Sequence, residues 1–197
     1  MAKQAWKGAP LLAPVPPVLV SCGSTEAPNI ITVAWAGIVN TRPPITYISL
    51  MPQRYSYNLV KESGEFVMNL PTKKLARAVD FCGVRSGKDC DKFEECKLTP
   101  EMGSALQTPL IAEAPLSLSC KVTQVIELGS HHMFLAEIVA VDVDERLIDK
   151  NGKMDLVKAE LLAYTHGEYF ALGERLGSFG FSVKKQRTKP RRPKAKK

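Results

Sequence analysis

The sequence predicts a mainly β protein in which an antiparallel barrel is surrounded by short peripheral helices. At least six segments have the composition and alternation of strands, whereas only two or three short segments resemble helices. Strands and helices do not alternate as a doubly wound sheet requires, and no Gly-x-Gly-x-x-Gly or Walker-type loop is present. The length of 197 residues suits one domain with a single sizeable core.

The first half of the chain predicts four strands. They are expected over Val18–Cys22, Asn29–Ala36, Ile45–Met51 and Glu65–Leu70. In the second of these, Ile31, Val33 and Trp35 alternate with Thr32 and Ala34, which is typical of a strand with one buried face. A loop that carries Pro43 and Pro44 is expected to lead into the third strand.

Capping patterns predict two short helices. Residues 57–63 are expected to form the first, with Ser56 as its N-cap and Gly64 as its end. Thr72 is expected to cap a second helix that runs through Phe81 and ends at Gly83. Residues 84–114 are expected to be irregular.

The longest strands are expected in the second half. They cover Leu116–Leu128 and Met133–Val143, joined by a turn at Gly129-Ser130. Apolar residues fall on both faces of Phe134–Val141, which predicts a central strand that is covered on both sides. Asn151-Gly152 predicts a tight turn. Leu161–Leu172 is expected to add mixed apolar and aromatic residues near the end.

Positive charge is concentrated at the C-terminus. The chain holds 27 Lys and Arg against 20 Asp and Glu, but nine of the basic residues lie within 184–197, which has no acid. The body therefore has 18 basic against 20 acidic residues, a net charge of −2. We predict one domain over residues 1–183 and a disordered basic tail over 184–197. A solvated tail is favoured over nucleic-acid contact, because the body shows no basic stripe.

The cysteines and the hydropathy favour a cytoplasmic protein without a metal. The five cysteines are scattered and form no Cys-x-x-Cys pair, so reduced thiols are expected rather than a zinc site. His131 and His132 are adjacent on a strand and point to opposite faces, which argues against a shared metal ion. No apolar run reaches the length of a membrane helix, and prolines interrupt the N-terminus, so we expect neither a membrane span nor a signal peptide.

One stretch predicts an anion site. Arg54 and Ser56 lie where a strand gives way to a helix, whose first N–H groups and dipole favour an anion. Ser56 adds a hydroxyl, and Arg54 adds a planar set of donors that matches phosphate. Lys92, in a charged segment, is a candidate second cation. The alternatives are a simple helix cap with an exposed arginine, and a solvated loop.

The neighbouring residues predict the other end of the same ligand. Trp35 offers an aromatic wall, and Asn29 and Thr32 offer hydrogen bonds to the edge of a ring; Ser49 follows on the next strand. His131, at the head of the last long strand, is suited to an anionic or redox ligand. Alternatively, Trp35 belongs to the core and Thr32 is only a good strand residue. The mixture fits a flat aromatic ligand that ends in a phosphate, and we interpret it as a flavin site.

An ordered set of motifs carries a resemblance to a known family. The set consists of Pro16-x-x-Leu19-Val20-Ser21-Cys22, Asn29-x-x-Thr32-x-Ala34-Trp35, Pro43-Pro44, Phe66-Val-x-Asn69-Leu70, Cys82-Gly83-x-x-Ser86-Gly87, Asp91-Lys92-Phe93 and Gly129-x-His131-His-Met-Phe-Leu-Ala-Glu137. Over roughly residues 10–180 the chain resembles the flavin reductase-like, FMN-binding split-barrel family, and within it the flavoredoxin branch.

The resemblance implies a split β-barrel homodimer that binds FMN near the dimer interface. It implies that Asn29, Thr32 and Trp35 line the flavin, that Ser56 and Lys92 serve the phosphate, and that His131 lies at the cofactor. An aromatic residue near the end of such folds often covers the ring, and Tyr164 is the candidate. FAD is the less favoured cofactor.

The expected function is electron transfer through FMN. Electrons would come from NAD(P)H or a protein donor and pass to a small-molecule or protein acceptor, as in a flavin reductase-like oxidoreductase. The alternative is a non-catalytic FMN-binding electron carrier without nicotinamide turnover. A nucleic-acid-binding protein that acts through the tail is a third and less favoured interpretation.

Overall fold

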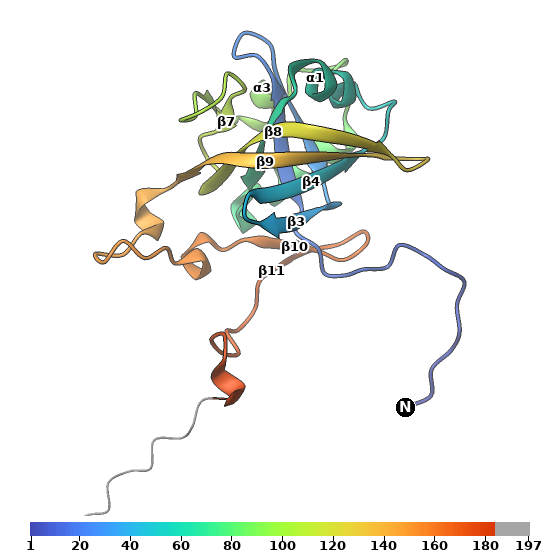
Figure 1. Ribbon diagram of the computed structural model, residues 1–197, viewed down its shortest axis with the longest axis vertical. Helices are drawn as coiled ribbons and strands as arrows, with labels where there is room; N and C mark the ends of the chain where they lie inside the picture. The colour runs from blue at the N-terminus through green and yellow to red at the C-terminus, as the bar shows by residue number, and fades with distance from the viewer. Residues whose placement is uncertain (184–197) are drawn as a thin grey trace, which may run out of the picture.

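The computed structural model describes residues 1–183, so the predicted tail over 184–197 lies outside the described residues. One seven-stranded sheet dominates the fold, in the order β2-β1-β5-β8-β9-β4-β3, with every neighbouring pair antiparallel (Figure 1). Its strands are β1 (Val18–Gly23), β2 (Pro28–Val33), β3 (Ala36–Thr41), β4 (Pro44–Leu50), β5 (Glu65–Leu70), β8 (Leu116–Glu127) and β9 (His132–Val143). The mainly β class is therefore confirmed.

The connection between β2 and β3 shows that the sheet closes on itself. These strands lie at opposite edges of the sheet, yet only Ala34 and Trp35 join them. Val33 and Ala36 are three Cα steps apart and so lie no more than about 11 Å from each other, which means that the two edges must meet. The Ser49 N–H donates to the Trp35 carbonyl at 2.9 Å beside this junction. The predicted antiparallel barrel is confirmed, with its seam between β2 and the β4–β3 edge.

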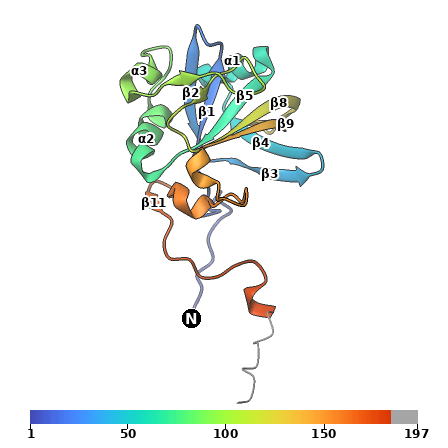
Figure 2. The same ribbon diagram turned by 90° about the vertical axis from the view of Figure 1, so that its left-hand side faces the viewer.

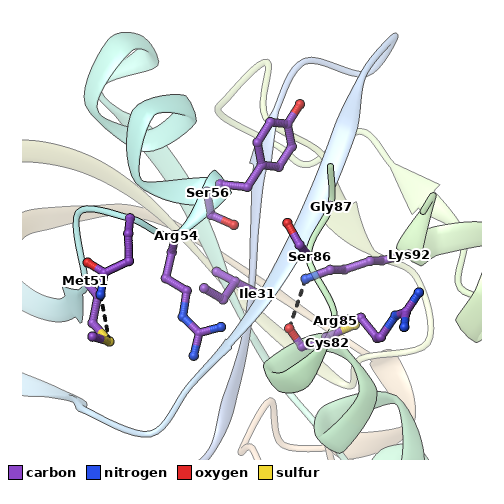
Figure 3. A pocket seen from close by; sticks show the side chains of 11 residues that line it. Ile31, Met51, Arg54, Ser56, Cys82, Arg85, Ser86, Gly87 and Lys92 are labelled. Atoms are coloured by element: carbon purple, nitrogen blue, oxygen red, sulfur yellow. Dashed lines mark hydrogen bonds between the residues drawn. The ribbon is translucent and has the colours of Figure 1, made fainter. Parts of the chain in front are cut away.

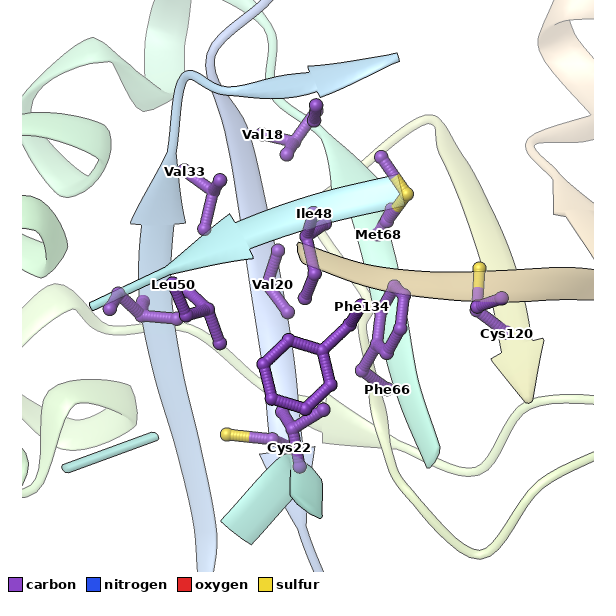
Figure 4. Packing of buried hydrophobic residues seen from close by; sticks show 14 of the residues in the cluster. Val18, Val20, Cys22, Val33, Ile48, Leu50, Phe66, Met68, Cys120 and Phe134 are labelled. Carbon is purple, nitrogen blue, oxygen red and sulfur yellow. The ribbon is translucent and has the colours of Figure 1, made fainter. Parts of the chain in front are cut away.

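Alternation along the strands separates two cores. On β1, Val18, Val20 and Cys22 point into the barrel, where Phe66 and Phe134 are fully buried (Figure 4). The other face of β1 and β2 lies against the helices α2 (Ala76–Val84) and α3 (Lys92–Cys96) (Figure 2). Side chains of this face, such as Leu19 and Ile30, pack against both helices. Burying each such side chain contributes roughly 1.5–3 kcal/mol, which holds both helices against the barrel.

The helices differ from the prediction at their starts and ends. Helix α1 (Tyr55–Ser63) has Arg54 as its N-cap, so Ser56 is not the cap but a buried residue of the first turn. Its end is as predicted, because Gly64 has φ +67° and donates its N–H to the Val60 carbonyl.

The second helix also begins and ends differently. A 3₁₀ turn (Lys73–Leu75) precedes α2 (Ala76–Val84), which continues through Gly83. Thr72 makes no side-chain cap hydrogen bond. A Cβ at Gly83 would lie 3.4 Å from the Thr32 Cβ on β2, which is an ordinary van der Waals contact.

Two strand predictions need correction. Asn29–Ala36 is not one strand, because the chain turns at Ala34–Trp35 and starts β3, which the sequence analysis missed. Strand β9 lies between β8 and β4 as expected, but within the described residues it is not covered along its whole length. Val139 and Val141 there are 41% and 48% exposed.

The remaining elements are short. The segment after α2 is largely irregular, as expected, but contains α3 (Lys92–Cys96), β6 (Pro100–Glu101) and β7 (Leu110–Ile111). A hairpin of β10 (Leu162–Tyr164) and β11 (Tyr169–Ala171) follows, together with the 3₁₀ turns Glu145–Leu147, Leu156–Ala159 and Phe181–Val183. Gly152 has φ +75° in the predicted tight turn, between the bridged residues Ile148 and Met154. No helix among residues 1–183 is long and apolar enough to cross a membrane.

Candidate functional site

Two adjoining cavities form a groove along the barrel seam, at the start of α1. The larger has a volume of about 270 Å³ and the smaller about 110 Å³. Both are lined by Ile31, Met51 and Arg54, so they adjoin. The groove brings together seven of the nine predicted site residues: Thr32, Trp35, Ser49, Arg54, Ser56, Lys92 and His131.

Lys92 places a buried positive charge at the larger cavity. Its side chain comes from the first residue of α3 and is only 3% exposed. Nζ donates to the Ile30 carbonyl at 2.7 Å. It also donates to the Cys82 carbonyl at 3.0 Å (Figure 3). Burial lowers the pKa of this ammonium. Lys92 forms no salt bridge within residues 1–183. The third N–H of its ammonium group, together with the positive charge, can therefore bind an anion in the cavity.

Ser56 and the N-terminus of α1 face Lys92 across the same cavity. Asn29 Nδ2 donates to Ser56 Oγ at 2.7 Å, so the serine hydroxyl is an acceptor there and keeps its own O–H to donate. Ser56 is 2% exposed. No side chain caps the start of this nine-residue helix, so the backbone N–H groups of its first turn can bind a ligand. Asn29 does not line the cavity itself; it orients Ser56.

A segment that was predicted to be irregular supplies the opposite wall of the larger cavity. Arg85, Ser86 and Gly87 all line the larger cavity, and Arg54 reaches in from the other side (Figure 3). Gly87 is required by close packing, because a Cβ there would lie 2.1 Å from Asn29 Oδ1. The Ser86-Gly87 pair belongs to one of the motifs that carry the family resemblance, and that was the signal for this wall.

The smaller cavity has an aromatic wall. The Trp35 and His131 rings lie 4.5 Å apart between centroids, at 60°. Trp35 is 40% exposed, so the alternative that it belongs to the core is wrong. Burial and the nearby Arg54 charge lower the pKa of His131, so its imidazole is neutral at neutral pH. Ser49 lines this cavity beside them.

Two predicted residues have a different position or role. Thr32 lines the smaller cavity, but its hydroxyl already donates to the Val79 carbonyl at 2.5 Å and ties β2 to α2. Tyr164 lies on β10, with its ring 5.2 Å from that of Tyr169, and lines neither cavity. A single chain therefore does not bring Tyr164 to the other site residues.

His132 points away from the groove, as the strand alternation predicts. Its Nδ1 lies 2.8 Å from the Tyr57 hydroxyl, which connects β9 to α1. Within residues 1–183, no group of three or more His, Cys, Asp or Glu side chains is placed to hold a metal ion.

The side chains of the groove fit an aromatic ligand that ends in a phosphate. A buried ammonium, a serine hydroxyl, a helix N-terminus and two arginines surround the larger cavity, and all of them favour an anion. Trp35 and the strand backbone line the smaller one. Arg54 lines both cavities, which therefore lie side by side.

The chain matches known proteins over most of its length. A family model described as flavin reductase like domain matches residues 12–173. An uncharacterized protein of Archaeoglobus fulgidus is 31% identical over 159 residues, which cover 81% of this chain and 88% of the relative.

Two solved structures share the fold. The flavoredoxin of Desulfovibrio vulgaris (Miyazaki F) has 32% identity and a TM-score of 0.85, and the comparison covers 93% of this chain and all of that one. The flavoredoxin of Methanosarcina acetivorans has 26% identity and a TM-score of 0.83 over 93% of this chain and all of that one.

Proposed function

Because the chain belongs to the flavin reductase-like family, we propose that the seam groove binds FMN and that the protein transfers electrons through it. The buried Lys92 charge, which has no salt bridge within residues 1–183, is the observation that supports this most strongly. A buried cation without a carboxylate partner is costly unless an anion completes the site. The phosphate of FMN supplies such an anion.

The residues divide into two groups. Lys92, Ser56 and Arg54 hold the phosphate, with Asn29 orienting the serine. Trp35 and the neutral His131 flank the ring end, where His131 can accept a proton or hydrogen-bond the ligand. When bound, FMN supplies the hydride and one-electron chemistry, and the protein supplies binding, orientation and electrostatics.

The proposed electron donor is NAD(P)H or a reduced protein, and the proposed location is the cytoplasm. All five cysteines are free thiols, as in a reducing compartment. Anaerobic stopped-flow mixing with NADH and NADPH separates a reductase from a carrier. Bleaching of the flavin within seconds supports a reductase, whereas an unchanged spectrum supports a carrier that is reduced by another protein.

A homodimer is also proposed, because apolar side chains of β3 and β9 remain exposed in a single chain. Ile38 and Val39 on β3, and Val139 and Val141 on β9, are each at least 41% exposed. A second copy packed against these strands would bury these side chains. Light scattering coupled to gel filtration measures the mass; a monomer at micromolar concentration would contradict the proposal.

Replacing Ser56 with alanine is expected to weaken FMN binding about 10–150-fold, the range for losing one hydrogen bond to a charged group. The reason is that its hydroxyl donates to the phosphate while Asn29 holds it in place. Quenching of FMN fluorescence measures the dissociation constant.

Ser63→Ala is the matched control for this substitution. It removes a hydroxyl from the far end of the same helix, where Ser63 donates to the Leu59 carbonyl and is exposed. Equal FMN affinity for Ser56→Ala and Ser63→Ala would remove Ser56 from the site.

A further inference from the structure

Cys82 and Cys96 form a close pair of thiols beside the groove. Their Sγ atoms are 3.8 Å apart, and each is within hydrogen-bonding reach of the other. Cys82 lies on α2 and Cys96 is the last residue of the five-residue α3. A disulfide needs a separation of about 2.05 Å, so a side-chain rotation or a small shift of α3 would bring the sulfurs to bonding distance.

This pair stands in the wall between two cavities. Cys82 is fully buried and lines the groove that Lys92 enters. Cys96 is partly exposed and lines a separate cavity of about 490 Å³ on the outer surface. That cavity has three cationic side chains and one carboxylate: Lys74, Arg77, Lys97 and Glu95. A small anionic reagent therefore reaches Cys96 first.

The two cysteines also lie at the two ends of a segment that lines the groove. Residues 83–95 lie between the two cysteines and supply Arg85, Ser86, Gly87 and Lys92 to the larger cavity of the groove. Lys92 donates to the carbonyl of Cys82 itself, so the cysteine pair and the lysine hydrogen bond join the same two helices. A bond between the sulfurs would restrict opening of the segment that holds the anion.

We propose that Cys82 and Cys96 form a reversible disulfide through exchange with a small anionic disulfide, and that this bond tightens retention of the phosphate ligand. The Cys96 thiolate attacks the disulfide R–S–S–R, forms Cys96–S–S–R and releases one R–S⁻. The Cys82 thiolate then attacks the Cys96 sulfur and releases the second R–S⁻. Two protein thiols lose two protons and two electrons, and the reagent is reduced to two thiols.

The surroundings decide the order and speed of these steps. The charges of Lys74, Arg77 and Lys97 favour an anionic disulfide at the outer cavity. Burial raises the pKa of the Cys96 thiol, and it raises that of Cys82 to about 12. The thiolates are therefore minor species at neutral pH, and exchange is expected over hours rather than seconds.

The effect on the ligand rests on the proposed FMN site, whereas the disulfide itself does not. The experiment therefore has a flavin-free part. The full chain is incubated with oxidised glutathione, and its mass and tryptic peptides are measured. The expected result is the loss of two hydrogens and a peptide that links Cys82 to Cys96. Trypsin cleavage after Lys88, which is exposed and lies between the two cysteines, is expected to become slower.

FMN affinity is then compared between the oxidised and reduced protein. We expect the dissociation constant to fall about fivefold on oxidation, since restraint of the segment lowers the cost of ordering it. Cys96→Ser is expected to abolish the difference. Cys90→Ser is the matched control, because Cys90 lies in the same segment and contacts the Ser86 carbonyl, and it is expected to preserve the difference.

The remaining outcomes test the pairing, the restraint of the segment and the proposed function separately. Absence of the linked peptide, or a link that involves Cys90, overturns the pairing. If Cys82 and Cys96 are linked but trypsin cleaves after Lys88 as fast as before, the disulfide does not restrain the segment. If the protein binds no FMN but shows the link and slower cleavage, the proposed function fails while the redox pair stands.

Discussion

Replacing Lys92 with methionine is expected to lower FMN affinity about 10–150-fold, the scale of a hydrogen bond to a charged group. Methionine keeps the length and apolar stem but has no charge. The carbonyls of Ile30 and Cys82 lose their donor, but the cost of burying an ammonium also disappears. These effects oppose one another, so the stability of the flavin-free protein should change by no more than about 2 kcal/mol.

A matched variant and two measurements test this prediction. Lys88→Met makes the same chemical change at an exposed position that lines neither cavity of the groove. It should leave the dissociation constant of FMN unchanged. Urea unfolding gives the stability and fluorescence quenching gives the affinity. If Lys92→Met retained FMN as the unchanged protein does, Lys92 would not contact the phosphate.

Replacing Gly87 with alanine is expected to damage the site more than its size suggests. The new Cβ would lie 2.1 Å from Asn29 Oδ1 and 2.8 Å from Tyr55 Cδ1. Either the segment shifts outward or Asn29 moves, and the second movement releases Ser56. We expect FMN affinity to fall at least about tenfold, since a site displaced by about 1 Å loses most of its preorganised hydrogen bonding.

Gly83→Ala is the control for this substitution. Its Cβ would lie 3.4 Å from its nearest neighbour, within α2, where alanine has the higher helix propensity. Thermal unfolding and FMN titration of both variants separate a folding defect from a binding defect. If the Gly87→Ala variant bound FMN with unchanged affinity, the chain around Gly87 would be able to shift without altering the groove.

The barrel could be predicted from the sequence because its buried strands are short apolar runs with turn residues between them. Strand β1 is apolar on both faces, since Val18, Val20 and Cys22 face one core and Leu19 faces the other. Strand β3 was missed because it carries Gly37 and exposes Ile38 and Val39, which removes the contrast between its faces. Gly83 does not end α2, because this helix packs against β2, and the local sequence does not reveal that contact.

The site was predictable where its residues are close in sequence. Trp35 lies in the turn between β2 and β3, whereas Arg54 is the N-cap of α1 and Ser56 lies in its first turn. All three line the groove. The wall formed by residues 85–87 was missed because its position depends on a distant contact between Gly87 and Asn29.

Buried hydrogen bonds were harder to foresee. The two carbonyl contacts of Lys92 join β2 to α2, and no spacing in the sequence indicates them. The same holds for the hydroxyl of Thr32, which bonds to the Val79 carbonyl rather than to a ligand. The family resemblance implies that Tyr164 covers the flavin ring. This stays a prediction, because Tyr164 lines neither cavity of the groove in a single chain.

Comparing FMN with riboflavin tests the central claim most directly, because the two differ only in the phosphate. Each is titrated into the flavin-free protein under the same conditions, with flavin fluorescence or calorimetry as the readout. The buried Lys92, the Ser56 hydroxyl and the start of α1 predict that FMN binds at least about 100-fold more tightly than riboflavin. Equal affinity for the two flavins, or no binding of FMN by well-folded protein, would contradict the account.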